Sequence, residues 1–132
     1  MNSNHIDLAF QWLKKADNDI VTAKQTLLLD GGPTDTVCFH AQQAVEKAMK
    51  ALLTFNEISF PRIHDLLRLL ELALQFLPEL EKMRTELAEI SNYAVEVRYP
   101  DDWFEPSRDD ALQALEIAKK IVKSVKQKIQ NN

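Results

Sequence analysis

The sequence has 132 residues, of which 45% are hydrophobic and 27% are charged, and its formal net charge is −4. A chain of this length fits a single domain whose core needs no disulfides or metal ions to hold it together. The negative charge argues against a general nucleic-acid coat protein, which needs a basic surface to displace counterions. The start of the chain has no signal-peptide pattern, and no stretch approaches the ~20 apolar residues that span a bilayer. We therefore expect one domain over residues 1–132, in the cytoplasm and away from membranes.

The first two predicted helices cover residues 4–29 and 33–56. Apolar side chains in the first recur at alternating steps of three and four, the spacing of one helical face. They are Ile6, Ala9, Leu13, Ala16, Ile20, Ala23 and Leu27. The Asp-Gly-Gly segment at 30–32 ends this helix, and Pro33 suits the first turn of the next, where a missing N–H costs nothing. Several alanines in the second helix would let other helices approach closely, so we expect it to be central.

A shorter third helix is predicted near residues 63–77, where leucine occurs on almost every side. Such a helix is either buried between neighbours or part of a subunit interface. The fourth helix should start after Pro78 and end near Arg98, because the residue before a proline, here Tyr99, is pushed out of helical geometry.

A polar and aromatic loop at 100–106 precedes a fifth helix that should start near Ser107. The chain has two glycines and no sustained alternation of polar and apolar residues, so no strand is expected. The prediction is an all-α fold: an antiparallel up-and-down bundle of four long helices and one short helix.

A second face of the 33–56 helix carries polar groups that a buried helix does not need. His40, Gln43, Lys47 and Lys50 follow the three-and-four spacing and form a strip of hydrogen-bond donors and positive charge. A phosphate group would suit this strip. The alternative is a solvated helix face that contacts only water.

Other kinds of chemistry have little support in the sequence. The three histidines lack metal-binding spacing and there is no Cys-x-x-Cys, so neither a metal site nor a cofactor is expected. There is no glycine-rich phosphate loop and no Gly-x-Ser-x-Gly elbow. Cys38 falls on the apolar stripe of its helix, which predicts a buried, reduced thiol and not a nucleophile.

Three separated segments resemble one protein family. Residues 39–51 read Phe-His-Ala-Gln-Gln-Ala-Val-Glu-Lys-Ala-Met-Lys-Ala, residues 64–66 read His-Asp-Leu, and residues 98–100 read Arg-Tyr-Pro. In this order they resemble the small prokaryotic HEPN domains, and the match spans about residues 10–125. The resemblance implies a helical bundle, usually dimeric, associated with RNA cleavage or nucleotide binding and often encoded beside a small nucleotidyltransferase.

The resemblance also bears on catalysis. In HEPN ribonucleases an arginine is followed, after four to six residues, by a histidine, and the pair cleaves RNA without metal. The arginine matches Arg98, but Trp103, Phe104 and Glu105 stand where the histidine would fall. None of them is an imidazole that exchanges protons near neutral pH. Only Arg98 is therefore carried over, as a residue that faces phosphate.

The remaining candidates come from residues near these motifs. His40 and His64 fall at positions that fit the family pattern, although His64 could equally fix the chain before the third helix by a hydrogen bond. Tyr99 and Trp103 could stack a base, or instead cap one end of the bundle or form a dimer contact. The candidate nucleotide- or RNA-binding residues are Arg98, Tyr99, Trp103, His40, Gln43, Lys47 and His64.

Three functions stay open at this point. The first is a non-catalytic HEPN protein that binds nucleotide or RNA and acts as a homodimer with a nucleotidyltransferase partner, as in a toxin–antitoxin module. The second is a metal-independent ribonuclease with an unusual acid/base group. The third is a purely structural helical adaptor. The missing histidine favours the first and argues against an enzyme.

Overall fold

The computed structural model describes residues 4–62, 65–92 and 105–131, and within them every regular element is a helix. The α-helices and one 3₁₀ helix, η1, are α1 (Asn4–Leu28), α2 (Thr34–Phe55), α3 (Leu66–Ala73), η1 (Pro78–Met83), α4 (Arg84–Ser91) and α5 (Arg108–Gln130). The all-α prediction is confirmed.

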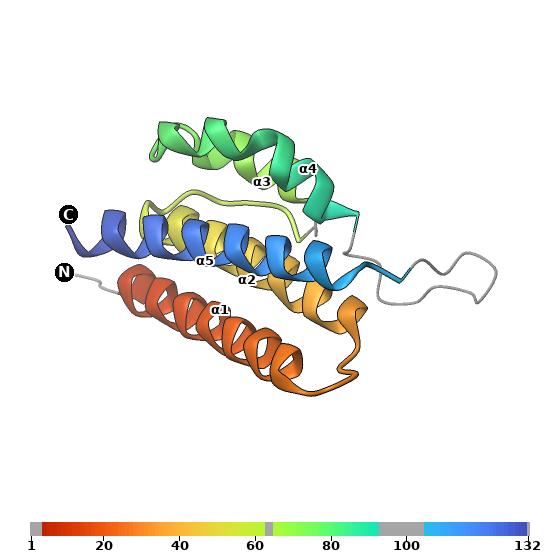
Figure 1. Cartoon of the computed structure of the whole chain (residues 1–132). Coiled ribbons are helices and arrows are strands. Elements are labelled where there is room, and N and C mark those ends of the chain that lie inside the picture. Colours follow the sequence, from red (N-terminus) through yellow and green to blue (C-terminus); the bar gives the residue numbers. More distant parts are fainter. Residues whose placement is uncertain (1–3, 63–64, 93–104, 132) are drawn as a thin grey trace.

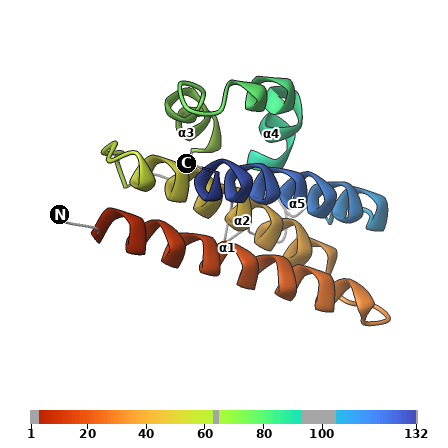
Figure 2. The ribbon, with the colours of Figure 1, turned by 90° about the vertical axis from the view of Figure 1, so that its left-hand side faces the viewer.

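Helix α2 occupies the centre of the bundle, as its alanines predicted. It packs against α1 on one side, against α5 along its length, and against α3 and α4 on the side opposite α1 (Figures 1 and 2). Helix α1 runs antiparallel to α2. The connector after α2 runs back along the bundle, so the α3–α4 hairpin forms a separate layer above α2 and α5 (Figure 1).

The helix ends have local causes. After α1 the backbone at Gly31 has φ 75°, a left-handed conformation that glycine adopts without strain. A Cβ atom at Gly32 would collide with the carbonyl oxygen of Thr26, so this position also requires glycine. Ser107 caps α5 through a reciprocal pair of bonds with Asp110, which satisfies N–H groups that the helix leaves free.

In the regions of the third and fourth predicted helices, the described α-helices are shorter than predicted. Helix α3 begins after Asp65, whose carboxylate accepts hydrogen bonds from the backbone N–H groups of Leu67 and Arg68. The segment after Pro78 begins as η1 and continues as α4. The expected end of this helix near Arg98 lies outside the described residues.

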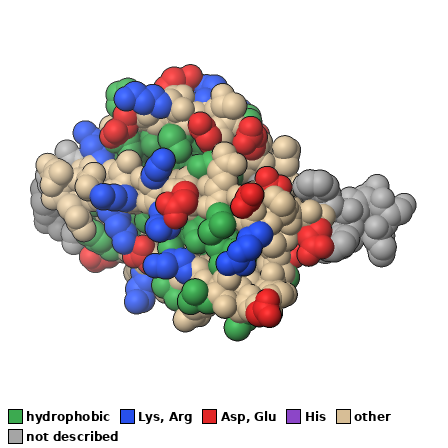
Figure 3. Space-filling view, in the orientation of Figure 1, with side chains coloured by type: hydrophobic (Ala, Val, Ile, Leu, Met, Phe, Trp, Pro, Cys, Tyr) green, Lys and Arg blue, Asp and Glu red, His purple; other side chains and the backbone are tan. Residues whose placement is uncertain are grey.

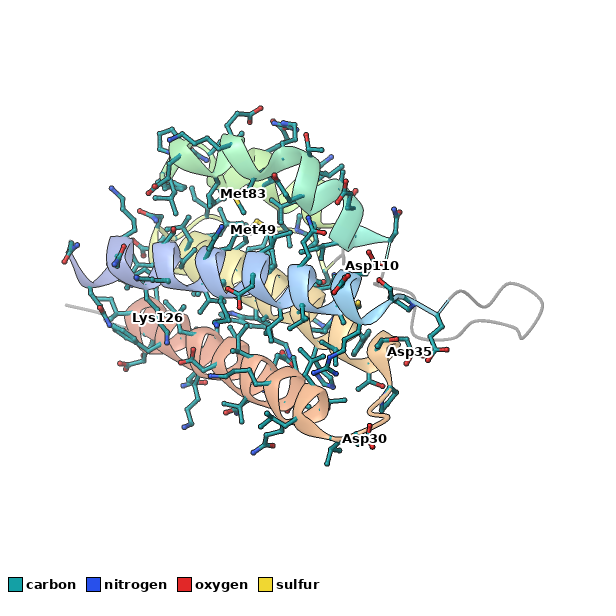
Figure 4. All side chains as sticks on the ribbon, viewed as in Figure 1. Asp30, Asp35, Met49, Met83, Asp110 and Lys126 are labelled. Carbon is teal, nitrogen blue, oxygen red and sulfur yellow. The ribbon has the colours of Figure 1, made fainter. Side chains whose placement is uncertain are left out.

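One hydrophobic core joins all of these elements. Its central side chains include Met49, Leu52 and Leu53 of α2, which are fully buried. Most of the leucines of the third helix are used here: Leu66, Leu69 and Leu70 are buried. Figure 4 shows Met49 of α2 and Met83 of η1 between α2 and the α3–α4 layer. The leucines of α3 are therefore explained by the packing of this helix against α2.

Candidate functional site

The polar strip of α2 is organised by a carboxylate from α1. Asp19 is 7% exposed and faces α2. Its Oδ2 atom accepts a hydrogen bond from Nζ of Lys47 at 2.6 Å, and its Oδ1 atom lies 2.8 Å from Nδ1 of His40. Because an ionised carboxylate only accepts, Nδ1 of His40 carries a proton in this contact. The same carboxylate therefore binds two of the four residues of the strip and ties α1 to α2.

The last residue of the strip, Lys50, forms its ion pair within α2. Nζ of Lys50 lies 3.2 Å from Oε2 of Glu46, one helical turn earlier, and both side chains are almost fully buried. The ammonium group also lies 5.4 Å from the ring centre of Trp12 and 5.8 Å from that of Phe60. Aromatic faces attract a cation at this distance. Lys50 is thus held by a carboxylate and two rings and is not presented to a ligand.

The glutamines extend the network along α2. Nε2 of Gln43 donates to Oε1 of Gln42 at 2.8 Å, and Nε2 of Gln42 reaches Oε1 of Glu46 at 3.5 Å. Gln42 and Glu46 are buried, so these bonds satisfy polar groups that would otherwise be costly in the core.

These contacts divide the predicted strip into two parts. His40 and Lys47 keep about a quarter of their side-chain surface exposed, at 27% and 23%. Lys50 is 7% exposed and is closed off. The described part of the strip that a ligand can reach is therefore His40, Gln43 and Lys47, and its positive charge is offset by Asp19.

Cys38 behaves as its position on the apolar stripe predicted. The thiol is fully buried, and this burial raises the pKa of Cys38 to about 12. The negative charges of Asp110 and Asp35, at the N-terminal ends of α5 and α2, supply the smaller part of this rise (Figure 4). A neutral, buried thiol is a poor nucleophile.

The other predicted site residues lie outside the described residues: His64, Arg98, Tyr99 and Trp103. Among the residues that are described, no cluster of histidine, cysteine and carboxylate side chains could hold a metal ion. Within that same part of the chain, no helix has the length and apolarity needed to cross a bilayer.

The profile of the HEPN domain matches residues 9–128, almost the whole chain. The chain belongs to the HEPN family. The family resemblance of the three sequence segments is thereby confirmed.

Two relatives extend this finding to whole proteins. "Putative toxin MJ1304" from Methanocaldococcus jannaschii is 27% identical over 136 residues, an alignment that covers 92% of this HEPN chain and 88% of MJ1304. The crystal structure of ST0689, an archaeal HEPN homologue, superposes with a TM-score of 0.72 at 27% identity and covers 92% of this chain and 97% of that one. The described helices are therefore arranged as in a solved HEPN protein.

The sequence did not predict the role of Asp19, the α1 carboxylate that binds His40 and Lys47 of α2. A signal was present: Asp19 lies three residues after Ala16 and four before Ala23, so a charged residue occupies the apolar stripe. An acid in such a position indicates a cationic partner on a neighbouring helix. Lys47 and His40 were the available partners, but the pairing could not be chosen without knowing which faces of α1 and α2 meet.

Proposed function

We propose that this HEPN protein belongs to a toxin–antitoxin-like module, binds a nucleotide or RNA without cleaving it, and acts as a homodimer with a nucleotidyltransferase partner. The observation that carries the proposal is family membership over nearly the whole chain, together with a full-length relative, MJ1304, that is provisionally named a toxin.

The proposed lack of catalysis rests on the histidines of the chain. The sequence has three, His5, His40 and His64, and none falls four to six residues after Arg98. His40 is engaged by Asp19, and His5 lies near Glu57 at the C-terminal end of α2, with 3.8 Å between Nδ1 and Oε1. This chain therefore lacks the histidine that, in ribonucleases of the family, would exchange a proton with RNA.

The proposed ligand contacts combine Arg98 and the reachable part of the α2 strip. Asp19 uses Nδ1 of His40 and one of the three N–H donors of Lys47, so Lys47 retains donors for a phosphate oxygen, whereas Nε2 of His40 donates only when the ring carries a second proton. Asp19 weakens this attraction by its own charge. We therefore assign the larger share of binding energy to Arg98, whose planar fork matches phosphate geometry. The further candidates for ligand contacts are Tyr99, Trp103, Gln43 and His64.

The test is a titration of the wild type with nucleoside mono- and triphosphates and short single-stranded RNAs at two salt concentrations. Binding should weaken as salt rises, because the contacts are largely ionic. Arg98→Ala should cost about 1.5–3 kcal/mol of binding free energy, the range for hydrogen bonds to charged groups. Arg68→Ala, which removes an exposed arginine from α3, is the matched control. A wild type that binds none of these ligands would favour a purely structural adaptor.

A further inference from the structure

The surface between α1 and α5, called the groove below, combines exposed apolar side chains with positive charge. Six large hydrophobic side chains are exposed among the described residues, and the helical positions of four of them place them on the sides of α1 and α5 that lie next to each other. They are Phe10, Val21, Leu28 and Leu112. Apolar side chains gathered on one face indicate an interaction site, whereas scattered ones carry no such meaning.

The positions of these residues follow from helical spacing. Phe10, Val21 and Leu28 are separated by eleven and seven residues, close to whole numbers of helical turns, so they lie along one side of α1. An ion pair between Asp17 of α1 and Lys126 of α5, at 2.6 Å, marks this side as the one that borders α5. Lys126 points from α5 toward α1 in Figure 4.

The facing side of α5 supplies positive charge. Leu112, Lys119 and Lys126 are spaced by seven residues and border the groove, with Lys123 beside them. On the α1 side Lys14 is exposed next to Phe10. Figure 3 shows basic and apolar side chains side by side over this face.

Two of the four carboxylates on this side of α1 and α5 are already neutralised, whereas Asp7 and Asp109 are exposed without an ion pair to a described residue. Asp17 is bound to Lys126, and Glu116 lies 3.2 Å from Lys119. Lys14 and Lys123 have no carboxylate partner among the described residues. The six lysines on this side of the two helices outnumber its four carboxylates, so the face carries an excess of positive charge on a chain whose net charge is −4: Lys14, Lys24, Lys119, Lys120, Lys123 and Lys126.

One end of the groove contains a pocket of about 290 Å³. Phe10 and Leu13 form its apolar wall, and the polar side chains that line it are Lys14, Asp17, Asn18, Lys126 and Gln130. A single bulky apolar side chain would fit there as an anchor, with the ammonium groups around it.

We propose that this groove docks an amphipathic helix of a partner protein whose apolar stripe is flanked by carboxylates. Anchors on an amphipathic helix recur at steps of three, four and seven and form a stripe, and Phe10, Val21 and Leu28, at steps of eleven and seven, form a stripe along α1. From Phe10 to Leu28 the exposed apolar stripe extends along about 27 Å of α1, the length of a helix of about 18 residues.

Two other occupants fit less well. A second copy of this chain using the same face would bring two surfaces of like net charge together, which is costly in an interface. RNA would satisfy the lysines, but single-stranded RNA is held by stacking on aromatic rings, and Val21, Leu28 and Leu112 are aliphatic. The inference does not depend on nucleotide binding at the α2 strip or at Arg98.

The experiment uses the full-length protein, labelled with ¹⁵N, and synthetic peptides of about 18 residues, the length expected above. One peptide is an ideal amphipathic helix with leucines flanked by glutamates. The second has lysines in place of the glutamates, and the third is a scramble of the first. We expect the acidic amphipathic peptide to shift amide signals along α1 from Phe10 to Leu28 and along α5, and to bind at least about tenfold more tightly than the other two.

Matched variants locate the site. Val21→Asp should weaken peptide binding at least about tenfold, whereas Leu8→Asp should not, because Leu8 is equally exposed, at 48% against 49%, on the other flank of α1. Lys14→Glu should weaken binding, and Lys15→Glu should change it little, since Lys15 is turned about 100° away. All four positions are at the surface, so circular dichroism should show the same helix content.

Several results would overturn the proposal. The acidic peptide could fail to bind, or the scrambled peptide could bind equally well. The amide signals that shift could also belong to residues outside the groove. Tighter binding of a short RNA than of the peptide at this face would favour a nucleic-acid partner instead. A dimer whose mass in light scattering is halved by Val21→Asp but not by Leu8→Asp would assign the groove to a second copy of the chain.

Discussion

Nζ of Lys47 lies 2.6 Å from Oδ2 of Asp19, so the central cation of the α2 strip is bound by a buried carboxylate from α1. The same distance separates Lys126 and Asp17 in an ion pair at the protein surface. Among the described residues, two lysine–aspartate pairs between helices thus have equal contact distances and different burial.

This pairing predicts a difference in stability. Asp19→Ala should lower the free energy of unfolding by about 2 kcal/mol, because it leaves His40 and Lys47 without their partly buried partner. Asp17→Ala should lower it by less than about 1 kcal/mol, since an exposed pair is screened by solvent. Urea unfolding of both variants measures the difference. Equal losses would show that burial of Asp19 does not strengthen its contacts.

The thiol of Cys38 predicts a pH dependence. Its pKa is about 12 in the folded protein against 9.0 for an ordinary cysteine, because the thiol is buried and faces carboxylates. Between these values the unfolded chain loses this proton and the folded protein keeps it, so the contribution to stability is intact below pH 9 and falls as pH rises toward 12.

At pH 10.5 this loss should reach at most about 2 kcal/mol. Cys38→Ala lacks this titration, so its unfolding free energy should fall less between pH 8 and pH 10.5 than that of the wild type, as measured by urea unfolding. Lysines titrate in both proteins and cancel in the comparison. Parallel pH profiles would contradict the prediction.

The end of α2 predicts a stabilising substitution. Glu57 has φ 58°, and the backbone N–H groups of Glu57 and Ile58 donate to the carbonyls of Thr54 and Leu53 in the pattern of a Schellman cap. A side chain is strained in this left-handed conformation, whereas glycine is not. Glu57→Gly should therefore raise the free energy of unfolding by about 0.5 kcal/mol after the entropy cost of glycine. Glu57→Ala, which keeps a Cβ, should give no gain in thermal or urea unfolding.

The proposed lack of catalysis predicts slow or absent RNA cleavage by the purified protein. Loss of one acid/base group typically costs about 10²–10⁴ in rate. The assay is incubation of labelled single-stranded RNA with the protein in EDTA, with Arg98→Ala as the control for contaminating nucleases. Robust cleavage that disappears in Arg98→Ala would establish an active ribonuclease, and Glu105 would then be the next residue to substitute.

The homodimer also stays a prediction, and one of its reasons has weakened. Leu66, Leu69 and Leu70 of α3 are buried within the bundle, so this helix offers less apolar surface for a dimer than its composition suggested. We still expect the HEPN protein to dimerise, as the family resemblance implies. Light scattering at micromolar concentration should give twice the mass of the chain. A mass of 15.2 kDa would mean a monomer.

The sequence alone determined the helical class, the places where α1 and α2 begin and end, the buried state of Cys38 and the HEPN family. These features depend on neighbouring residues: a helical face follows from apolar side chains three and four apart, and a helix end follows from glycine, proline or a capping side chain. The third and fourth helices were placed less accurately, because composition does not show where α-helical geometry gives way to the 3₁₀ segment at Pro78–Met83.

Only the tertiary structure decided what the polar residues do. Seen in the sequence, His40, Lys47 and Lys50 were equivalent members of one cationic strip. In the fold, Asp19 binds the first two, while Glu46 and two aromatic rings enclose the third. The α1–α5 groove was equally hidden, because its apolar and basic side chains come from both ends of the chain. Electrostatic partners depend on which helix faces meet, and that contact is set by packing of the whole core.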